Sequence, residues 1–466
     1  MTLRYTRAVI GVSAVSGALL ATSLTSAQAA PTTQKPRSGA VSVYTTDLAP
    51  LATLGGVKIT GGGYGSAVAM KPGSSDVVYG LTDRGPNVDA PSGDDKVEPL
   101  PSFTPSIGEF RLDRNGNAVL LKKIPLRDSQ GKPYNGQVNP TNSTSETIVD
   151  LAGKTLPTST DGYDSEGLVA MADSTFYVSD EYGPFITHFN ARGRQIGRFS
   201  PIDGTLPAEL RNRVPNKGME GLTVMPDGGT LVGIMQNPLA DGVTTKNAGK
   251  DVVTRIVTVN IRTGKSHEYL YVLDSSSTGN SEITALNDHE FLVDERDGAV
   301  PSATGDKKLW KIDLDGATDV GPSSTVKGAT YTATAANGYL GLTVGGKSLE
   351  QLTDGMTTAD AVTELKSLGI SVAAKPSRPY LDVDKLILSL SPDTGVFDHD
   401  KIEGVATPDH GKTLVISNDS DFGIDGSTGT GTDADLPPFT PHAKVSPAGV
   451  QDDGQYLVVH IDKLTQ

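Results

Sequence analysis

Short apolar runs alternate with turn residues along most of the chain, and one arrangement of them recurs. It is clearest in DGYDSEGLVAMADSTFYVSDEYGP, residues 161–184, where an acidic stretch precedes a short apolar strand. A turn containing Asp follows, then a second apolar strand, and then another polar cluster. Two strands joined by a turn of this kind form a β-hairpin. The segment therefore predicts one hairpin with carboxylates at both of its open ends.

Similar hairpins begin near residues 65, 219, 281 and 402. After most of them comes a further pair of alternating strands, joined by turns such as DRNGN, NARGR and IRTGK. Each repeat is then two hairpins, or four strands, which is the sequence pattern of a propeller blade. We therefore predict an all-β fold, a β-propeller of four-stranded blades. Five units are visible, and we expect six blades within a range of five to seven.

The largest insertion between these units covers residues 318–383. Its segment SLEQLTDGMTTADAVTELKSLGI has a helical apolar period, so we expect a partly helical insertion that could also hide the sixth unit. The apolar segment KLILSLSPDTG after it is interpreted as a returning strand. Terminal strands commonly complete a blade in propellers, and we expect this of GQYLVVHIDKL or of VSVYTTDL.

The N-terminus has the pattern of an export signal. Arg4 and Arg7 precede an apolar run, and Ala27-Gln28-Ala29 supplies a small-x-small cleavage signature. The apolar run is shorter than the roughly 20 residues that a membrane-spanning helix needs. We predict a signal peptide over residues 1–29, a flexible segment over 30–45 and a single propeller domain over 46–466. The protein should be secreted after cleavage near Ala29.

The composition excludes several classes of partner and enzyme. The chain has no cysteine, so its own core or a metal must stabilise it. A net charge of −15 argues against nucleic acid or an anionic membrane as a partner. The same charge is typical of calcium binding, because hard cations take carboxylate and carbonyl oxygens, although acidity can also serve solubility alone. The motifs G-x-S-x-G and H-E-x-x-H are absent, which argues against an α/β-hydrolase and a zinc protease.

Equivalent positions of successive blades meet near the axis of a propeller. The acids that lead four of the hairpins should therefore form one group: Glu166, Glu220, Glu282 and Glu403. Four carboxylates brought together repel one another unless a cation lies among them or their pKa values rise. We predict a calcium site there, with Glu166, Glu220 and Glu403 as catalytic candidates. The alternative is that each Glu accepts backbone N–H bonds within its own blade.

The polar clusters that close the hairpins provide the remaining candidates. As metal ligands we predict Asp180, Glu181, Glu282, Glu295, Asn418, Asp419 and Asp421. Four cations stand beside these acids and are predicted to bind an anionic substrate: Arg84, Lys217, Arg296 and Lys401. Pairing with the neighbouring carboxylates is the alternative role of each cation.

Several of these segments resemble one known family. SEGLVAMADSTFYVSDEYGP, NKGMEGLTVMPDGGTLVGIMQNPL and KIEGVATPDHGKTLVISNDSDFG are similar to the phytase-like family, described as having esterase-like activity. The resemblance implies a secreted bacterial β-propeller related to the phytases that use calcium and basic residues to hydrolyse phosphate monoesters. The chain departs from a dedicated phytase because it lacks a dense set of Lys and Arg near the repeats.

Two functions follow as expectations. The first is a calcium-dependent hydrolase of phosphate or carboxylic esters, acting as a monomer on a small-molecule ester or phosphoester. The second is a non-catalytic propeller that calcium stabilises and that binds a ligand or a cell-wall component.

Overall fold

The computed structural model describes residues 39–91, 95–141, 146–240, 251–336, 339–390, 396–429 and 438–464. The chain divides into two compact units, Met1–Gln34 and Lys35–Gln466. The first unit, and with it the predicted signal peptide and its end at Ala29, lies outside the described residues. All described strands and helices belong to the second unit.

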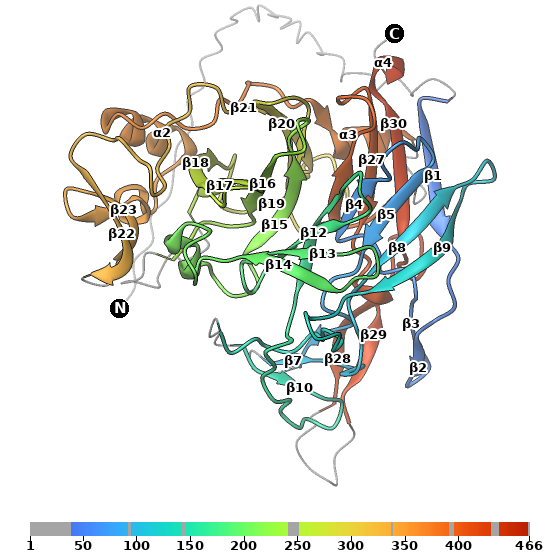
Figure 1. Cartoon of the computed structure of the whole chain (residues 1–466). Coiled ribbons are helices and arrows are strands. Elements are labelled where there is room, and N and C mark those ends of the chain that lie inside the picture. The colour runs from blue at the N-terminus through green and yellow to red at the C-terminus, as the bar shows by residue number, and fades with distance from the viewer. Residues whose placement is uncertain are drawn as a thin grey trace, which may run out of the picture. The chain divides into compact units, whose positions relative to one another are not determined.

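Five four-stranded antiparallel units make up most of this second unit (Figure 1). The first two units consist of β4 (Ala67–Met70), β5 (Val77–Leu81), β8 (Ser106–Leu112) and β9 (Asn117–Pro125), and of β11 (Ser165–Ala170), β12 (Phe176–Asp180), β13 (Ile186–Phe189) and β14 (Gln195–Phe199). The third consists of β15 (Met219–Val224), β16 (Thr230–Met235), β17 (Val253–Asn260) and β18 (Ser266–Val272). The last two consist of β19 (Gly279–Ala285), β20 (Glu290–Arg296), β21 (Lys308–Asp313) and β25 (Leu381–Asp382), and of β26 (Ile402–Ala406), β27 (Thr413–Asn418), β30 (Gln455–His460) and β1 (Val41–Thr46).

The first strand of each unit lies at the centre. Contacts run from β4 to β11, then to β15, β19 and β26, and from β26 back to β4. These inner strands therefore form a closed ring, which is the arrangement of a β-propeller. The predicted mostly β, propeller-like fold is confirmed. The predicted count of six blades is not confirmed, since the described strands give five units of four.

The N-terminal strand completes the fifth unit. Strand β1 pairs antiparallel with β30, with Val41 opposite Val459, and its end pairs in parallel with β9. Both terminal segments proposed from the sequence thus lie side by side in one sheet. Alternate residues of β1, Val41 and Val43, pack on the core between the fifth unit and α3 (Val383–Leu390). Residues 41–45 of the predicted flexible segment therefore belong to a strand, and the boundary at residue 46 falls within it.

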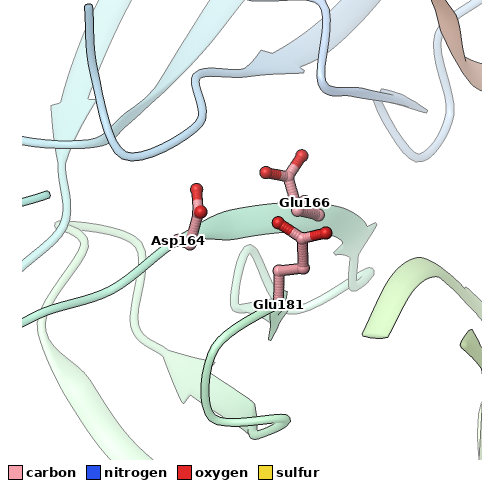
Figure 2. Close-up of side chains that lie close together, drawn as sticks. All are labelled: Asp164, Glu166 and Glu181. Carbon is pink, nitrogen blue, oxygen red and sulfur yellow. The ribbon is translucent and has the colours of Figure 1, made fainter. Parts of the chain in front are cut away.

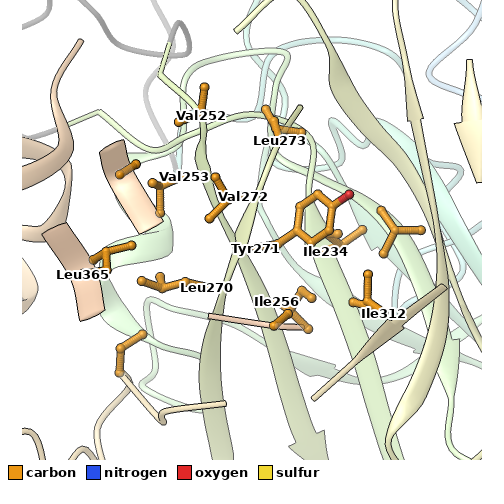
Figure 3. Close-up of a cluster of buried hydrophobic side chains, with 14 of the residues drawn as sticks. Ile234, Val252, Val253, Ile256, Leu270, Tyr271, Val272, Leu273, Ile312 and Leu365 are labelled. Carbon is orange, nitrogen blue, oxygen red and sulfur yellow. The ribbon is translucent and has the colours of Figure 1, made fainter. Parts of the chain in front are cut away.

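The insertion forms no sixth four-stranded unit in its described part. It contains a three-stranded sheet of β22 (Ala329–Ala336), β23 (Tyr339–Val344) and β24 (Lys347–Ser348), followed by α1 (Leu349–Thr353) and α2 (Thr358–Ser367). Ser348 and Thr357 cap the two helices, because their side chains accept N–H bonds from Gln351 and Asp360. Figure 3 shows Leu365 of α2 among side chains of β17 and β18, within the largest apolar cluster.

The segment after the insertion is a helix and not the expected strand. Residues 383–390 form α3, which buries Val383, Leu386 and Ile387 against the fourth and fifth units. A short continuous apolar run fits a buried strand and a buried helix equally well, so periodicity could not distinguish the two.

Several short elements lie outside the four-stranded units and the insertion. They are β2 (Ala52–Leu54), β3 (Val57–Ile59), β6 (Val88–Asp89), β7 (Lys96–Val97), β10 (Ile148–Val149), β28 (Ile424–Thr428), β29 (Thr440–Ala443), η1 (Ala208–Asn212), η2 (Asp421–Gly423) and α4 (Ile461–Leu464). Strands β6 and β28 contact each other, although more than 300 residues separate them in sequence. Strands β6, β7 and β28 contribute Val88, Lys96 and Ile424 to one wall of a cavity at the end of the ring.

The inner strands approach so closely at Gly221 that a side chain at this position is excluded. A Cβ placed on Gly221 of β15 would lie 2.5 Å from the Ile283 nitrogen and 2.6 Å from the Glu282 Cα of β19. Both are backbone atoms, so the neighbouring strand itself would have to move.

We expect Gly221→Ala to lower the free energy of unfolding by about 1–3 kcal/mol, because the added methyl overpacks the contact between the two inner strands. Thermal or denaturant unfolding measures the change. Gly298→Ala is the matched control, since a Cβ there meets no atom within 4 Å. Equal stability of the two variants would contradict the proposed tight contact.

Candidate metal and substrate site

The register of the inner hairpins decides which residues face the axis. Ser165, Met219, Asn280 and Ile402 lie opposite the ends of the second strands, and an irregularity follows each of them. The residues directly after these four positions are therefore equivalent, and they are Glu166, Glu220, Ser281 and Glu403. Three of the four predicted glutamates occupy one structural position, whereas the fourth unit has Ser281 there.

Glu282 is the exception, and its assignment to this group is wrong. It occupies the position of Gly167, Gly221 and Gly404, one residue further along the strand. Its carboxylate accepts N–H bonds from Leu222 (3.0 Å) and Ile283 (2.9 Å), between inner strands. Successive strand residues face opposite sides, so a shift of one residue moves the side chain away from the site. Glu282 thus accepts backbone N–H bonds, as in the alternative to metal binding, although one donor, Leu222, belongs to the neighbouring unit.

The equivalent residues open into a cavity of about 360 Å³ at one end of the ring. Glu166, Glu220 and Glu403 come from the inner strands. Glu181, Gln236, Arg296 and Asp419 come from the ends of the second strands or just beyond them. Ten carboxylates line the cavity, against four cationic side chains. Such an excess of negative charge favours a cation as occupant.

Two groups of carboxylates are close enough to hold metal ions. In Asp164, Glu166 and Glu181, one oxygen of each lies within 4.8 Å of the others, and the same holds for Glu166, Glu220 and Glu403. Figure 2 shows the first group, with Asp164 and Glu166 at the start of β11 and Glu181 just after β12. All five residues are buried, and Glu166 belongs to both groups. The Oε2 atom of Glu220 is buried without a hydrogen-bond partner among the described residues, as an open ligand atom would be.

Burial and mutual repulsion shift the proton equilibria of these acids. Burial, with a further contribution from Glu403, raises the pKa of Glu220 to about 8. Burial and Glu220 also raise the pKa values of Glu166 and Glu181 well above their usual range. Without a cation, the group therefore retains protons at neutral pH. A divalent cation would favour the ionised forms instead.

Three of the four predicted substrate-binding cations line this cavity. The Arg84 guanidinium binds Glu146 (3.0 Å) and the Tyr182 hydroxyl, and its backbone N–H binds Asp164. Arg296 pairs with Glu403, and Lys401 pairs with Asp419 (3.0 Å) and Asp421. The charge-pairing alternative is thus realised, although all three cations still face the cavity.

Lys217 does not line this cavity. It faces an adjoining one, which it shares with Arg296 and Gln236.

Three further metal candidates are not brought to the cavity: Asp180, Glu295 and Asn418. Asp180 accepts N–H bonds from Asp164 and Tyr182. Glu295 accepts from the Tyr271 hydroxyl (2.7 Å) and pairs with Lys375 (2.7 Å), and Asn418 accepts the Gln455 N–H (2.7 Å). The residue that follows each of these three, Glu181, Arg296 or Asp419, does line the cavity, because successive strand side chains alternate.

The structure adds residues that the prediction did not select. Asp83 and Asp164 line the cavity, and Gln236 donates to Glu220 Oε1 (2.7 Å). Asp164 precedes Glu166 by two residues, a spacing that places both on one side of a strand and could have indicated it. Lys444 could not be found this way, because it reaches Asp421 (2.7 Å) from a distant loop.

The pKa of Glu220 leads to a pH dependence. Between its ordinary value of 4.5 and about 8, the folded protein keeps a proton that the unfolded chain has released. Stability of the metal-free protein should therefore fall as pH rises through this window. We expect Glu220→Gln to fall less steeply, as measured by melting temperatures at several pH values. Glu364→Gln on α2 serves as the control, and equal slopes in the two variants would contradict the assignment.

Among the described residues, no helix has the length and hydrophobicity needed to cross a bilayer. An uncharacterized secreted protein of the fungus Arthroderma benhamiae is 30% identical over 174 residues. That match covers 29% of this chain and 34% of the relative, so the chain spans about a third of that protein.

Two solved structures match this chain at low identity and low TM-score. A catalytically inactive virginiamycin B lyase from Staphylococcus aureus shares 12% identity at a TM-score of 0.31, over 90% of this chain and 99% of the lyase. A PQQ-bound aldose sugar dehydrogenase from Streptomyces coelicolor shares 11% at a TM-score of 0.29, over 91% of this chain and 99% of the dehydrogenase. Similarity at this level does not bear on activity.

The family model named Phytase-like, with the description "esterase-like activity of phytase", matches residues 59–358, which include the first three units, the first three strands of the fourth unit and most of the insertion. The resemblance inferred from the repeat motifs is thereby confirmed. The chain belongs to the Phytase-like family.

Proposed function

We propose that this protein is a secreted, calcium-dependent hydrolase of phosphate or carboxylic esters. The single observation that carries the proposal is that Glu166 is common to two buried carboxylate groups in one cavity. Two cations that share a carboxylate are a recurring arrangement in hydrolytic enzymes. Membership of a family described by esterase-like activity agrees with ester hydrolysis but does not specify the ester.

The ligand atoms favour calcium. Both groups consist of carboxylates only, without His or Cys, and such oxygen sets suit hard cations. Asp164 and Glu181 would hold one ion, Glu220 and Glu403 the other, and Glu166 both. Calcium bound there would supply Lewis-acid polarisation of an ester oxygen.

The side chains around these ligands can bind and orient a substrate. Arg84, Arg296 and Lys401 are three of the four cations that line the cavity, and they would face the charged oxygens of a phosphoester. In the calcium-free protein burial raises the pKa of Glu220 to about 8, so this carboxyl group keeps a proton close to neutral pH. With calcium bound Glu220 would be ionised: its Oε2 atom, which has no partner among the described residues, would be the ligand atom, and the carboxylate would be the base candidate of the group.

The second candidate is a non-catalytic, calcium-stabilised propeller that binds a ligand or cell-wall component. The observation that favours it is that Arg296 and Lys401 are already engaged by Glu403, Asp419 and Asp421. In that function calcium would relieve repulsion among the carboxylates and no bond would be broken. Secretion and a monomeric state are predictions common to both candidates.

Calcium binding tests the part that both candidates share. Glu166→Gln should abolish or weaken binding at both sites at once, by at least about tenfold, because it removes the ligand that the two groups of described carboxylates share. Isothermal titration calorimetry of the chelator-treated protein measures this, with Glu364→Gln as control. Unchanged calcium affinity in Glu166→Gln would refute the shared-ligand arrangement.

Turnover separates the two candidates. The wild-type protein should hydrolyse a phosphomonoester or a p-nitrophenyl carboxylic ester with calcium present and lose this activity with a chelator. We expect Glu220→Gln to remain folded and to lose about 100-fold or more in kcat, as for loss of a general base. Absence of turnover on both ester classes at every calcium concentration would favour the binding protein instead.

A further inference from the structure

A second cavity, of about 460 Å³, adjoins the carboxylate cavity. The two share Gln236 and Arg296, so a molecule in one can extend toward the other. The side chains that line the two cavities differ in charge. No carboxylate is among the described residues that line the second cavity, whereas Lys217, Arg296 and several hydroxyl groups are.

The fourth unit of the ring creates this difference. At the inner-strand position where three other units have glutamate, it has Ser281. At the end of its second strand, where the second and fifth units have Glu181 and Asp419, it has Arg296. One unit has therefore replaced carboxylates by a hydroxyl group and a guanidinium at equivalent positions. Among the four units that share this register, only the fourth lacks a carboxylate at both positions, since the third keeps Glu220 and has the neutral Gln236 at the second.

The side chains at this place present donors. Ser281 is 1% exposed and accepts a bond from Arg296 Nε (2.9 Å), so its own hydroxyl proton is free to be donated. Lys217 is half-buried, and its ammonium group forms no ion pair with any described residue. An unpaired ammonium beside a buried hydroxyl and a guanidinium is suited to an oxyanion.

We propose that this second cavity is an oxyanion subsite, formed by Lys217, Ser281 and Arg296, which binds an acidic group of the ligand beside the group held in the carboxylate cavity. The occupant is a carboxylate, phosphate or sulfate group, since all three present oxygens to the same donors. In the frame of the proposed hydrolase, the substrate carries an acidic group in addition to its ester. That last step rests on the proposed function, whereas anion binding itself does not.

The position of Arg296 sets the relation between the two cavities. Its Nη2 atom pairs with Glu403, a member of one carboxylate group, while Nε binds Ser281 at the second cavity. A cation that takes Glu403 as a ligand competes with this ion pair. The guanidinium is then available to the anion, so the two occupants should support each other's binding.

Binding of sulfate and acetate tests the proposal without any turnover. Calorimetric titrations would use the full chain, metal-free and calcium-loaded, with two variants, Lys217→Met and Lys265→Met. Lys265 is an exposed lysine on the turn between β17 and β18 and is the matched control. Saturable binding of at least one anion is expected in the wild type and in Lys265→Met, weakened about tenfold in Lys217→Met. Lys217→Arg should restore most of the affinity.

The other outcomes of these titrations either overturn the subsite or identify the group that it binds. Absence of saturable anion binding in both metal states, or equal affinity in the two methionine variants, would overturn the subsite. Preference for sulfate over acetate would assign a tetrahedral group, and the reverse a carboxylate. Anion binding without ester hydrolysis would refute the hydrolase and leave the subsite intact, so the two failures are distinguishable. Melting curves of each variant confirm that loss of binding is not loss of fold.

Discussion

The close approach of five inner strands around one axis is the constraint on which the site depends. At Gly221 the strands are so near that an added Cβ would meet the backbone of β19. The preceding residue of the same strand then points toward the axis. Glutamate at that position in three units places three carboxylates in one cavity, the first and last of which are more than 200 residues apart in sequence. Packing of the inner strands therefore brings together carboxylates that repel one another, although they are far apart in sequence.

That conflict determines the chemistry available to the cavity. A buried carboxylate group can be neutralised by protons, by cationic side chains or by metal ions, and this structure provides for all three. Protons are retained because burial raises the pKa of Glu220 to about 8. Arginine and lysine compensate part of the charge through Glu403, Asp419 and Asp421. The remaining excess lies at Glu166, which forms no ion pair with any described residue and toward which oxygen atoms of both groups converge.

The repeat pattern allowed the fold class and three central glutamates to be predicted, because strand period and turn chemistry are local properties. It failed where two local interpretations were equivalent. In the fourth unit S-E-I aligns residue by residue with E-G-L of the second, so Ser281 is equivalent to Glu166 and Glu282 to Gly167. An alignment of the glutamates alone selects Glu282 in place of Ser281. The segment of α3 is apolar throughout, so its helical state depends on the core that it meets. Partners such as Lys444 depend on tertiary structure alone.

Closure of the ring joins the two ends of the folded unit. Strand β1 pairs antiparallel with β30. Next to this pair the Thr46 N–H donates a hydrogen bond to the Gly454 carbonyl (3.0 Å), which lies 408 residues further along the sequence. Contacts between such remote residues are entropically costly and form late. A nascent chain therefore cannot assemble the fifth sheet until β30 has been synthesised. During that interval the two partners of β30, β1 and β27, would each expose an unpaired edge, which makes the unfinished molecule, and not the finished one, the form most prone to aggregate.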